Sequence, residues 1–453
     1  MKAKELFTYL MILTVFSGGF VIGSMSFEFY LCYLVFLSFI FFALISRYSL
    51  WMNRGFLLLF LYFSLSSLIS IIIFKYSPML LVKQVVGISF SAFSYYLLIK
   101  VNNYDVEKLF KLYLRVALII AMLGIFQEIS YLLNFVPGYD WQFFIPKAGE
   151  VNTTLFLMRI SSLSPEPAML AVLISPAMFI ALNNFFLKKG IYFDRFNSAV
   201  ILLAYALTFS SLAYIGLGLA FILIMYRQGR LNIRSRKIFY LPLVLLLLFL
   251  MFYSCYQFIP DFRSRTDAVF ALFYNSSAKI YDLNSPMLRN ASVFILFSNY
   301  EVAFDSLRTS PLIGYGLGSH AAHFDQYFQS FLDSAKRMGS YELLHGWGFG
   351  VSKDDANSLI LRLVSETGVI GMMIIFWLIG KFFIKRETRA AALFDPGNLS
   401  LINNAILLLI LLRLIRFGHY FVDGLFFFAF LYYFSSKEYG RLGLVENDKV
   451  VAR

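Results

Sequence analysis

The sequence predicts an all-α, polytopic integral membrane protein with about twelve transmembrane helices and a large loop outside the cytoplasm. Of its 453 residues, 60% are hydrophobic and only 14% are charged, whereas soluble domains carry about 25% charged residues. Apolar stretches of about 20 residues, long enough to cross a bilayer, recur along the whole chain. The Lys and Arg residues lie in short clusters between these stretches, as membrane topology requires.

Each apolar stretch is expected to be an α-helix, because backbone polar groups find no partners in lipid. The expected spans are 7–25, 28–46, 55–74, 79–99, 113–135, 165–186, 197–210, 211–226, 238–258, 358–380, 399–416 and 421–436. The residues from Thr208 to Ser211 predict a tight turn between the seventh and eighth spans. One long tilted helix is the alternative, but it would put the next basic cluster on the opposite side of the membrane.

The basic residues also predict the orientation, because cytoplasmic loops carry an excess of Lys and Arg. Most of the 39 basic residues fall in cytoplasmic segments if both termini are cytoplasmic. The chain then divides into a membrane domain of nine spans (1–258, with an outer loop at 136–164), a large outer loop (259–357), and a membrane domain of three spans with a cytoplasmic C-terminus (358–453). Long polar loops of this kind usually carry function.

Several chemistries have no motif in this sequence. A GxxxxGK[ST] phosphate loop is missing, and so are HExxH and CxxC, so we expect neither a metal nor a cofactor. The net charge of +13 follows from membrane topology and does not indicate nucleic-acid binding. The ionisable residues within the spans do not form the relay that is typical of a proton-driven transporter.

The first candidate site lies where the outer loop enters the sixth span. Pro165 and Pro167 interrupt the helix start and fix the path of Glu166 between them. Arg159 is then an anion ligand and Glu166 a site residue at the membrane surface. In the alternative, Glu166 stabilises the helix N-terminus, by about 0.3–1 kcal/mol, and Arg159 is its partner.

Arginines in the large outer loop are further candidate anion ligands, because the guanidinium group suits phosphate oxygens. The positive-inside rule explains basic residues in cytoplasmic loops, but not in a loop outside the cytoplasm. They are Arg263, Arg265, Arg289 and Arg308. As an alternative, each is a solvated charge paired with Asp261, Asp267, Glu301 or Asp305. The alternating glycines within 310–320 permit tight turns that direct backbone N–H groups toward an anion.

Two more groups lie near the last three spans. Asp355 precedes the tenth span, in which Arg362 and Glu366 are four residues apart and favour a structural ion pair. Arg416 and His419 lie between the last two spans, outside the cytoplasm and against the positive-inside trend. This placement indicates anion binding, and a cation that anchors the chain at the interface is the alternative.

These motifs form a recognisable combination over residues 155–375. It consists of Arg159 with Glu166-Pro167, Thr208-Phe209-Ser210, the segment from Ser310 to Gly318, and Asn357-Ser-Leu followed by Glu366-Thr-Gly-Val-Ile-Gly371. In their order and spacing they resemble the O-antigen polymerase and ligase superfamily, whose relatives include other bacterial exopolysaccharide polymerases. Two positions depart from the pattern: Ala356 stands where ligases commonly carry His, and Ser211 stands where members often carry Arg.

The resemblance implies a glycosyltransferase with a multi-span, GT-C-like fold in the bacterial inner membrane and an active site that faces the periplasm. Its substrates are then undecaprenyl-pyrophosphate-linked oligosaccharides, and the growing glycan passes from its carrier to a newly arrived lipid-linked repeat unit with inversion. No nucleotide or metal is required, since polyprenyl pyrophosphate is itself a good leaving group. A polysaccharide chain-length regulator is a candidate partner.

Such a reaction requires cations at the pyrophosphate and a general base at the acceptor hydroxyl. The candidate pyrophosphate ligands are Arg159, Arg289, Arg308 and Arg416. The candidate bases are His345, Glu166, Asp355 and His419, with histidine favoured by its ordinary pKa.

The missing histidine at Ala356 favours a Wzy-type polymerase. The alternatives are an O-antigen ligase that transfers glycan to lipid A core and a non-enzymatic polysaccharide transporter. The transporter should show two related halves, which this sequence lacks.

Overall fold

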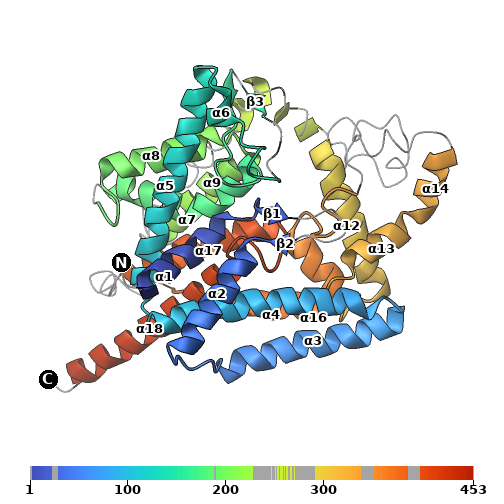
Figure 1. The fold of residues 1–453 in the computed structure, drawn as a ribbon, viewed down its shortest axis with the longest axis horizontal. Helices are drawn as coiled ribbons and strands as arrows, with labels where there is room; N and C mark the ends of the chain where they lie inside the picture. The colour runs from blue at the N-terminus through green and yellow to red at the C-terminus, as the bar shows by residue number, and fades with distance from the viewer. Residues whose placement is uncertain are drawn as a thin grey trace.

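The computed structural model describes most of the chain as a helical assembly (Figure 1). The described residues are 3–22, 29–147, 149, 151–154, 156–187, 190–227, 291–337, 350–385 and 398–451, with isolated positions between 246 and 270. Arg265, Arg289, His345 and most of the predicted span 238–258 lie outside the described residues.

The elements follow one another in this order: α1 (Ala3–Leu13), η1 (Thr14–Phe16), β1 (Val21–Ile22), β2 (Phe29–Tyr30), α2 (Cys32–Ile45), α3 (Arg54–Phe74), α4 (Pro78–Val101), α5 (Val106–Leu132), α6 (Val136–Tyr139), β3 (Thr153–Thr154), β4 (Leu157–Met158), α7 (Pro167–Leu187), α8 (Arg195–Leu207), α9 (Ser211–Arg227), α12 (Ala291–Thr309), α13 (His320–Tyr327), α14 (Gln329–Arg337), α16 (Leu359–Lys381), α17 (Leu399–Ile415) and α18 (Leu425–Val451). The strands pair only as two short antiparallel hairpins among the described residues. The all-α prediction is therefore confirmed.

Within the described ranges, five helices are long and apolar enough to cross a membrane: α3, α4, α5, α7 and α16. Four shorter helices, α2, α8, α9 and α17, are also apolar. The protein is thus a multi-pass membrane protein. Twelve remains the number of spans that the sequence predicts.

The N-terminal region differs from the predicted span at 7–25, whereas α2 lies within the predicted span at 28–46. The first helix ends with η1 at Phe16, and a β-hairpin pairs Val21 with Tyr30 before α2 begins at Cys32. Two glycines explain the interruption. A Cβ on Gly18 would lie 2.0 Å from Asp423 Oδ1, and a Cβ on Gly19 would lie 2.7 Å from a methyl group of Ile145. The chain leaves the helix here because it must pass close to other segments.

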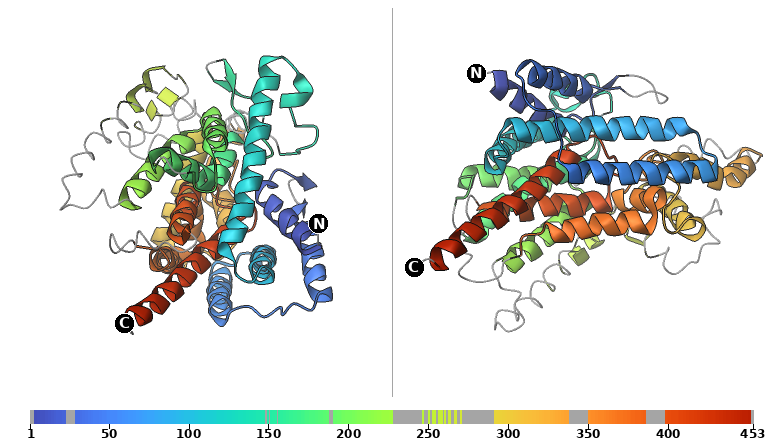
Figure 2. Two further views of the ribbon diagram at one scale, coloured as in Figure 1. Left: turned by 90° about the vertical axis from the view of Figure 1, so that its left-hand side faces the viewer. Right: turned by 90° about the horizontal axis from the view of Figure 1, so that it is seen from below.

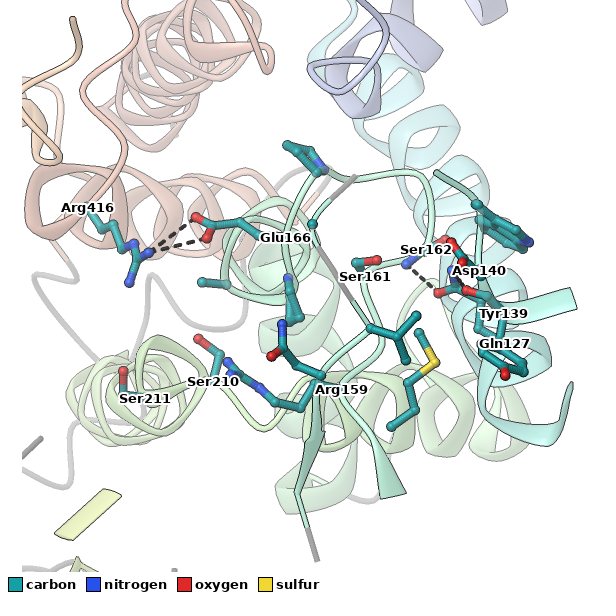
Figure 3. Close-up of a pocket in the computed structure, with 18 residues that line it drawn as sticks. Gln127, Tyr139, Asp140, Arg159, Ser161, Ser162, Glu166, Ser210, Ser211 and Arg416 are labelled. Carbon is teal, nitrogen blue, oxygen red and sulfur yellow. Dashed lines mark hydrogen bonds and ion pairs between the residues drawn. The ribbon is translucent and has the colours of Figure 1, made fainter. Parts of the chain in front are cut away.

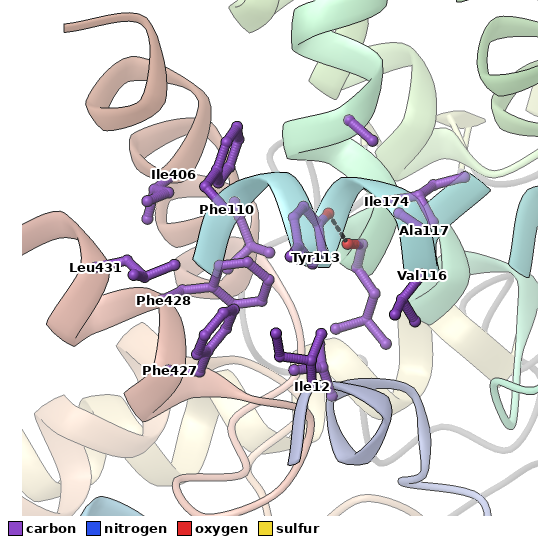
Figure 4. Packing of buried hydrophobic residues seen from close by; sticks show 14 of the residues in the cluster. Ile12, Phe110, Tyr113, Val116, Ala117, Ile174, Ile406, Phe427, Phe428 and Leu431 are labelled. Atoms are coloured by element: carbon purple, nitrogen blue, oxygen red, sulfur yellow. Dashed lines mark hydrogen bonds between the residues drawn. The ribbon is translucent and has the colours of Figure 1, made fainter. Parts of the chain in front are cut away.

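The core forms around α7, which packs against α5, α8, α9 and α17. In the most apolar part of α7, 78% of the residues are buried. The side chains of Phe427 and Phe428 from α18 and Ile12 from α1 surround Tyr113 of α5 (Figure 4). The Tyr113 hydroxyl donates to the Leu173 carbonyl oxygen at 2.6 Å, so its polar atom is satisfied within the apolar core.

Helix α3, by contrast, is largely exposed. In its most apolar part only 17% of the residues are buried. It packs against α4 and α16, and these three helices run alongside one another while α5 crosses their direction (Figures 1 and 2). Large apolar side chains such as Leu58 and Ile72 remain two-thirds exposed, at 67% and 66%. Lipid is the solvent that suits such a face.

Segments that the sequence assigns to the cytoplasm lie together at one end of the bundle. The rings of Tyr104 and Phe434 are 5.0 Å apart, and Tyr192 donates to Glu107 at 3.4 Å. Arg227 Nε donates to Ser400 Oγ at 3.3 Å. The first contact joins the α4–α5 turn to α18, the second joins the α7–α8 connection to α5, and the third joins the end of α9 to the start of α17.

Candidate active site

A pocket of about 310 Å³ opens where three connections meet: α5 to α7, α8 to α9, and the segment after α17 (Figure 3). Its lining residues are mostly polar. They are Gln127, Tyr139, Asp140, Trp141, Gly149, Val151, Asn152, Met158, Arg159, Ser161, Ser162, Pro165, Glu166, Pro167, Ala168, Ser210, Ser211 and Arg416. Three of the predicted site residues, Arg159, Glu166 and Arg416, are thus brought together from distant parts of the sequence.

Glu166 occupies the position immediately before α7. Pro167 begins the helix, where its missing N–H costs nothing and its fixed φ is suitable. The Glu166 carbonyl oxygen accepts hydrogen bonds from Met169 N at 3.1 Å and Leu170 N at 3.2 Å. The two prolines therefore place the Glu166 side chain at the helix N-terminus and direct it to the pocket, as the sequence predicts.

The ion-pair partner of Glu166 is Arg416, and not Arg159 as the alternative interpretation assumed. A single nitrogen, Arg416 Nη2, lies 3.3 Å from Oε2 and 3.4 Å from Oε1 of Glu166. Both side chains are partly exposed, at 26% and 38%. The sequence could not reveal this pair, because the two residues are 250 positions apart.

Arg159 follows the β3–β4 hairpin at the pocket wall. Its backbone N–H donates to the Asn152 carbonyl at 2.9 Å, and the N–H of the buried Ile160 donates to the Leu207 carbonyl at 3.2 Å. These bonds tie the strand segment to the end of α8. The Arg159 side chain extends toward Ser210 at the pocket (Figure 3).

The predicted turn between the seventh and eighth spans is confirmed. Helix α8 ends at Leu207 and α9 begins at Ser211, so a single long helix is wrong. Phe209 has a φ of 43°, and Thr208 Oγ1 donates to the Tyr205 carbonyl at 2.8 Å. Ser210 Oγ accepts from the Leu212 N–H at 3.3 Å.

Two helix N-termini therefore face the pocket, since both the start of α7 and the start of α9 contribute lining residues. Each N-terminus carries about half a positive charge, because its first N–H groups lack helical partners. Together with Arg159 and Arg416 they outweigh the carboxylates of Glu166 and Asp140. The arrangement favours a polyanion.

His419 and Asp355, both candidate bases, form a second cluster beside this pocket. Their Nε2 and Oδ2 atoms lie 3.3 Å apart, and Asp355 Oδ1 accepts the Asn357 N–H at 3.1 Å. Burial lowers the pKa of the His419 imidazole, and the Asp355 carboxylate acts in the opposite direction. His419 is three residues from Arg416, so one segment carries a member of each cluster.

Arg308 lies apart from the pocket. It belongs to α12, which packs on α16, and its guanidinium covers the Phe304 ring at 4.5 Å. Arg263 is exposed and lies 4.0 Å from Asp267, as the solvated-charge alternative assumed. The remaining candidates, Arg289, Arg265 and His345, lie outside the described residues.

The glycine segment after Ser310 does not direct its first N–H groups toward an anion, so that prediction is wrong for them. The Tyr315 N–H donates to the Ser365 carbonyl at 2.8 Å, and the Gly316 N–H donates to the Glu366 carbonyl at 2.9 Å. A Cβ on Gly314 would lie 2.6 Å from the Ser365 carbonyl oxygen. The glycines serve to pack this segment against the backbone of α16.

Sequence reasoning missed several pocket residues, of which Gln127 is the clearest. Its Oε1 accepts the Ser162 N–H at 2.7 Å, and Ser162 Oγ donates to the Ile120 carbonyl at 2.8 Å. These bonds hold the wall segment against α5. A glutamine within an apolar span was the available signal, since polar residues in such spans usually mark a site.

Comparison with known protein families adds one match. Residues 196–376 match the family model described as O-antigen ligase. The resemblance to the O-antigen polymerase and ligase superfamily is thereby confirmed. No curated protein matches the chain.

The matched segment of the O-antigen ligase family runs from α8 into α16 and includes the Thr208–Ser211 turn and Asp355. Arg159, Glu166, Arg416 and His419 lie outside it, and the fold brings them to it. The family supports an O-antigen polymerase or ligase role and implies lipid-linked polysaccharide substrates.

Proposed function

We propose that the protein is an O-antigen polymerase. It transfers a growing glycan from undecaprenyl pyrophosphate to a new undecaprenyl-pyrophosphate-linked repeat unit at the periplasmic face of the inner membrane. The observation that carries this proposal is the pocket in which Arg159, Arg416 and the N-termini of α7 and α9 meet. This set of donors and positive charges fits a pyrophosphate group.

One donor in particular supports the assignment. Arg416 Nε is buried and, within the part of the chain that the structure describes, makes no hydrogen bond to the protein. A buried donor without a partner costs about 1–3 kcal/mol. A pyrophosphate oxygen in the pocket would satisfy it, and Glu166 holds the same guanidinium at Nη2 without using Nε.

The reaction then needs only groups that this chain supplies. The acceptor hydroxyl oxygen attacks the anomeric carbon, the bond from that carbon to the pyrophosphate oxygen breaks, and the configuration inverts. Arg159 and Arg416 stabilise the negative charge that moves onto the pyrophosphate. A base accepts the hydroxyl proton: Glu166, which lines the pocket, or His419, which Asp355 orients.

A polymerase is favoured over a ligase by the residue before Asn357. Ala356, where ligases commonly carry a histidine, is fully buried and has a φ of 56°. No imidazole is available at that position. In this chain the imidazole beside Asp355, the residue before Ala356, is that of His419, which lies between α17 and α18.

The test compares surface glycans of a deletion strain with those of strains complemented by wild type, Arg159→Ala, Arg416→Ala or Arg308→Ala. For a polymerase, the deletion leaves lipid A core that carries a single repeat unit. Arg159→Ala and Arg416→Ala copy that pattern at normal expression. Arg308→Ala, an arginine of the same predicted side that lies apart from the pocket, restores the long polymer.

Two other outcomes overturn the proposal. Bare core together with accumulated lipid-linked polymer identifies a ligase. Loss of all repeat units, with lipid-linked units retained on the cytoplasmic side, identifies a transporter.

A further inference from the structure

The segment between α17 and α18, residues 416–424, is here called the site loop. It carries Arg416 into the pocket and His419 to Asp355. Its backbone is irregular: Phe417 has a φ of 70° and Asp423 a φ of 56°. A loop in this conformation needs external support to hold two functional side chains in place.

The first support is Arg362 of α16, whose side chain is buried. Its Nη1 donates to the Gly418 carbonyl at 3.1 Å, while Nε donates to Glu366 Oε1 at 3.0 Å and Nη2 to Gln84 Oε1 at 2.9 Å. Each nitrogen of the guanidinium thus has a different partner, and one of them is the backbone of the site loop.

The second support is Arg413 of α17, whose side chain is fully buried. Its Nη2 donates to the His419 carbonyl at 2.8 Å and to the Val422 carbonyl at 3.4 Å. Its Nη1 lies 3.7 Å from Asp423 Oδ2. This one group therefore contacts three positions of the site loop.

Neither Arg362 nor Arg413 lines the pocket, so anion binding there does not explain them. Buried charges are costly unless they are paired, and each arginine lies beside a buried carboxylate: Glu366 at 3.0 Å from Arg362 and Asp423 at 3.7 Å from Arg413. Both arginines instead donate to carbonyl groups of the site loop, Arg362 to Gly418 and Arg413 to His419. These carbonyls belong to the peptide groups immediately before and after the α-carbon of His419.

The loop also packs against the segment that carries Asp355. The Phe417 N–H donates to the Asn357 carbonyl at 3.1 Å. A Cβ on Gly418 would lie 1.8 Å from the Asp355 carbonyl oxygen. Only glycine permits this approach, so the position of the loop is fixed from three sides.

We propose that Arg362 and Arg413 are positioning residues, which clamp the site loop so that Arg416 and His419 are aligned for glycosyl transfer. The proposal rests on the proposed function for the reaction, but the clamp itself is a property of the fold. The clamp predicts that holding the loop requires the several fixed N–H donors of each guanidinium group, and not its positive charge alone.

The decisive variant is Arg413→Lys, because lysine keeps the charge opposite Asp423 but cannot bridge two carbonyls in the same geometry. The purified protein in nanodiscs is given lipid-linked repeat units. We expect kcat to fall on the order of 10- to 100-fold, as for small misplacements of reacting groups, with little change in KM. The acidic limb of the kcat profile should also move, since the contact of His419 with Asp355 changes.

Hydrogen–deuterium exchange gives a readout that does not depend on activity. Peptides that cover 416–424 should exchange faster in Arg413→Lys and in Arg362→Lys, while peptides within α7 remain as in wild type. Gly418→Ala displaces the same loop without removing a charge and should give the same pattern. Gly440→Ala, where a Cβ meets no atom within 4 Å, is the matched control.

The results separate the two proposals. Wild-type kinetics and unchanged loop exchange in Arg413→Lys would overturn the clamp. A wild-type protein that forms no polymer would overturn the proposed function, and faster loop exchange in the variants would still establish the clamp.

Discussion

At the scale of single residues, the pocket holds two guanidinium groups and two carboxylates, and the N-termini of α7 and α9 make its overall charge positive. The Glu166–Arg416 pair is partly exposed, and such pairs contribute about 0–1 kcal/mol to stability. Its members therefore contribute little to the fold. Under the proposed function their role is electrostatic, and their substitution should affect function far more than folding.

Arg416→Ala should lower kcat/KM on the order of 10²- to 10³-fold, the usual cost of removing one donor that stabilises developing charge. Arg416→Lys keeps the positive charge but loses the planar, multi-donor guanidinium group. Its kcat/KM should therefore lie between those of wild type and Arg416→Ala. Initial rates with lipid-linked repeat units measure the effect, and the melting temperature should change little. Loss of activity that tracks loss of folding would contradict this assignment.

The pH profile distinguishes His419 from Glu166 as the base. A base acts when deprotonated, so activity falls as the pH drops through its pKa. Asp355 raises the pKa of His419, so Asp355→Asn should lower that pKa and move the acidic limb of kcat/KM to lower pH. An acidic limb that is unchanged in Asp355→Asn but disappears in Glu166→Gln would assign the base to Glu166.

Local sequence predicts the position of a side chain where that position depends on residues nearby in the sequence. Proline on both sides of Glu166 fixes it at a helix start, and the four-residue spacing of Arg362 and Glu366 gives the 3.0 Å pair that was predicted. The Glu166–Arg416 contact depends instead on how α7 and α17 pack. No local pattern contains that information.

At the scale of elements, α16 bends at Gly368, whose φ of 63° and ψ of −166° suit glycine almost alone. A Cβ there would lie 2.5 Å from the Leu312 carbonyl group. The bend lets the Val369 N–H donate to the Pro311 carbonyl at 2.8 Å, which joins the helix to the glycine segment. The apolar pattern of the tenth span predicts the helix but not this bend.

Gly368→Ala should destabilise the protein by at least about 1–3 kcal/mol, the usual cost of such backbone strain. Gly380→Ala in the same helix is the control, because a Cβ there meets nothing within 4 Å. In a helix interior the control should be neutral or stabilising by up to about 1 kcal/mol. Melting temperatures in detergent compare the two, and equal values would show that the bend is not required.

The junction of α12, α13 and α16 contains a buried histidine that should make stability depend on pH. His320 contacts Ser365 Oγ at 2.7 Å and Asn299 Oδ1 at 2.9 Å. Burial lowers its pKa from 6.5 to about 3. The unfolded chain therefore binds a proton below pH 6.5 that the folded chain binds only near pH 3, so stability falls as the pH drops between these values.

His320→Gln should reduce this pH dependence, although it lowers stability at neutral pH. Melting temperatures between pH 7 and pH 4 measure the slope. The same slope in wild type and variant would exclude His320 as its source. A comparison variant is His323→Gln, which removes a buried imidazole that lies 2.9 Å from Asp305. It should change the slope less, because the Asp305 carboxylate opposes the effect of burial on the pKa of His323.

At the scale of the whole molecule, segments far apart in the sequence meet at two places. The α3–α4 turn meets α13 through Tyr76 and His323, and the α4–α5 turn meets α18 through Tyr104 and Phe434. The hydrophobic pattern predicts the bounds of most described apolar helices to within a few residues, since lipid imposes the pattern directly. It failed at 7–25, where two glycines packed against distant segments end the helix.

Cysteine accessibility tests the orientation that the basic residues predict. In a protein with Cys32→Ser and Cys255→Ser, single cysteines are placed at the exposed positions Asn103, Phe143 and Gly440. Phe143→Cys, near the pocket, should react with a membrane-impermeant maleimide in intact spheroplasts. The other two should react only after permeabilisation, because cytoplasmic segments carry the basic clusters.

The two positions that are predicted to be cytoplasmic also check the fold itself. Tyr104, next to Asn103, contacts Phe434 of α18, so Asn103 and Gly440 must behave alike. If both react in intact spheroplasts and Phe143→Cys does not, the predicted orientation is reversed, and the pocket faces the cytoplasm. Since a periplasmic polymerase requires the pocket outside, that result would also remove the proposed function while leaving the arrangement of helices intact.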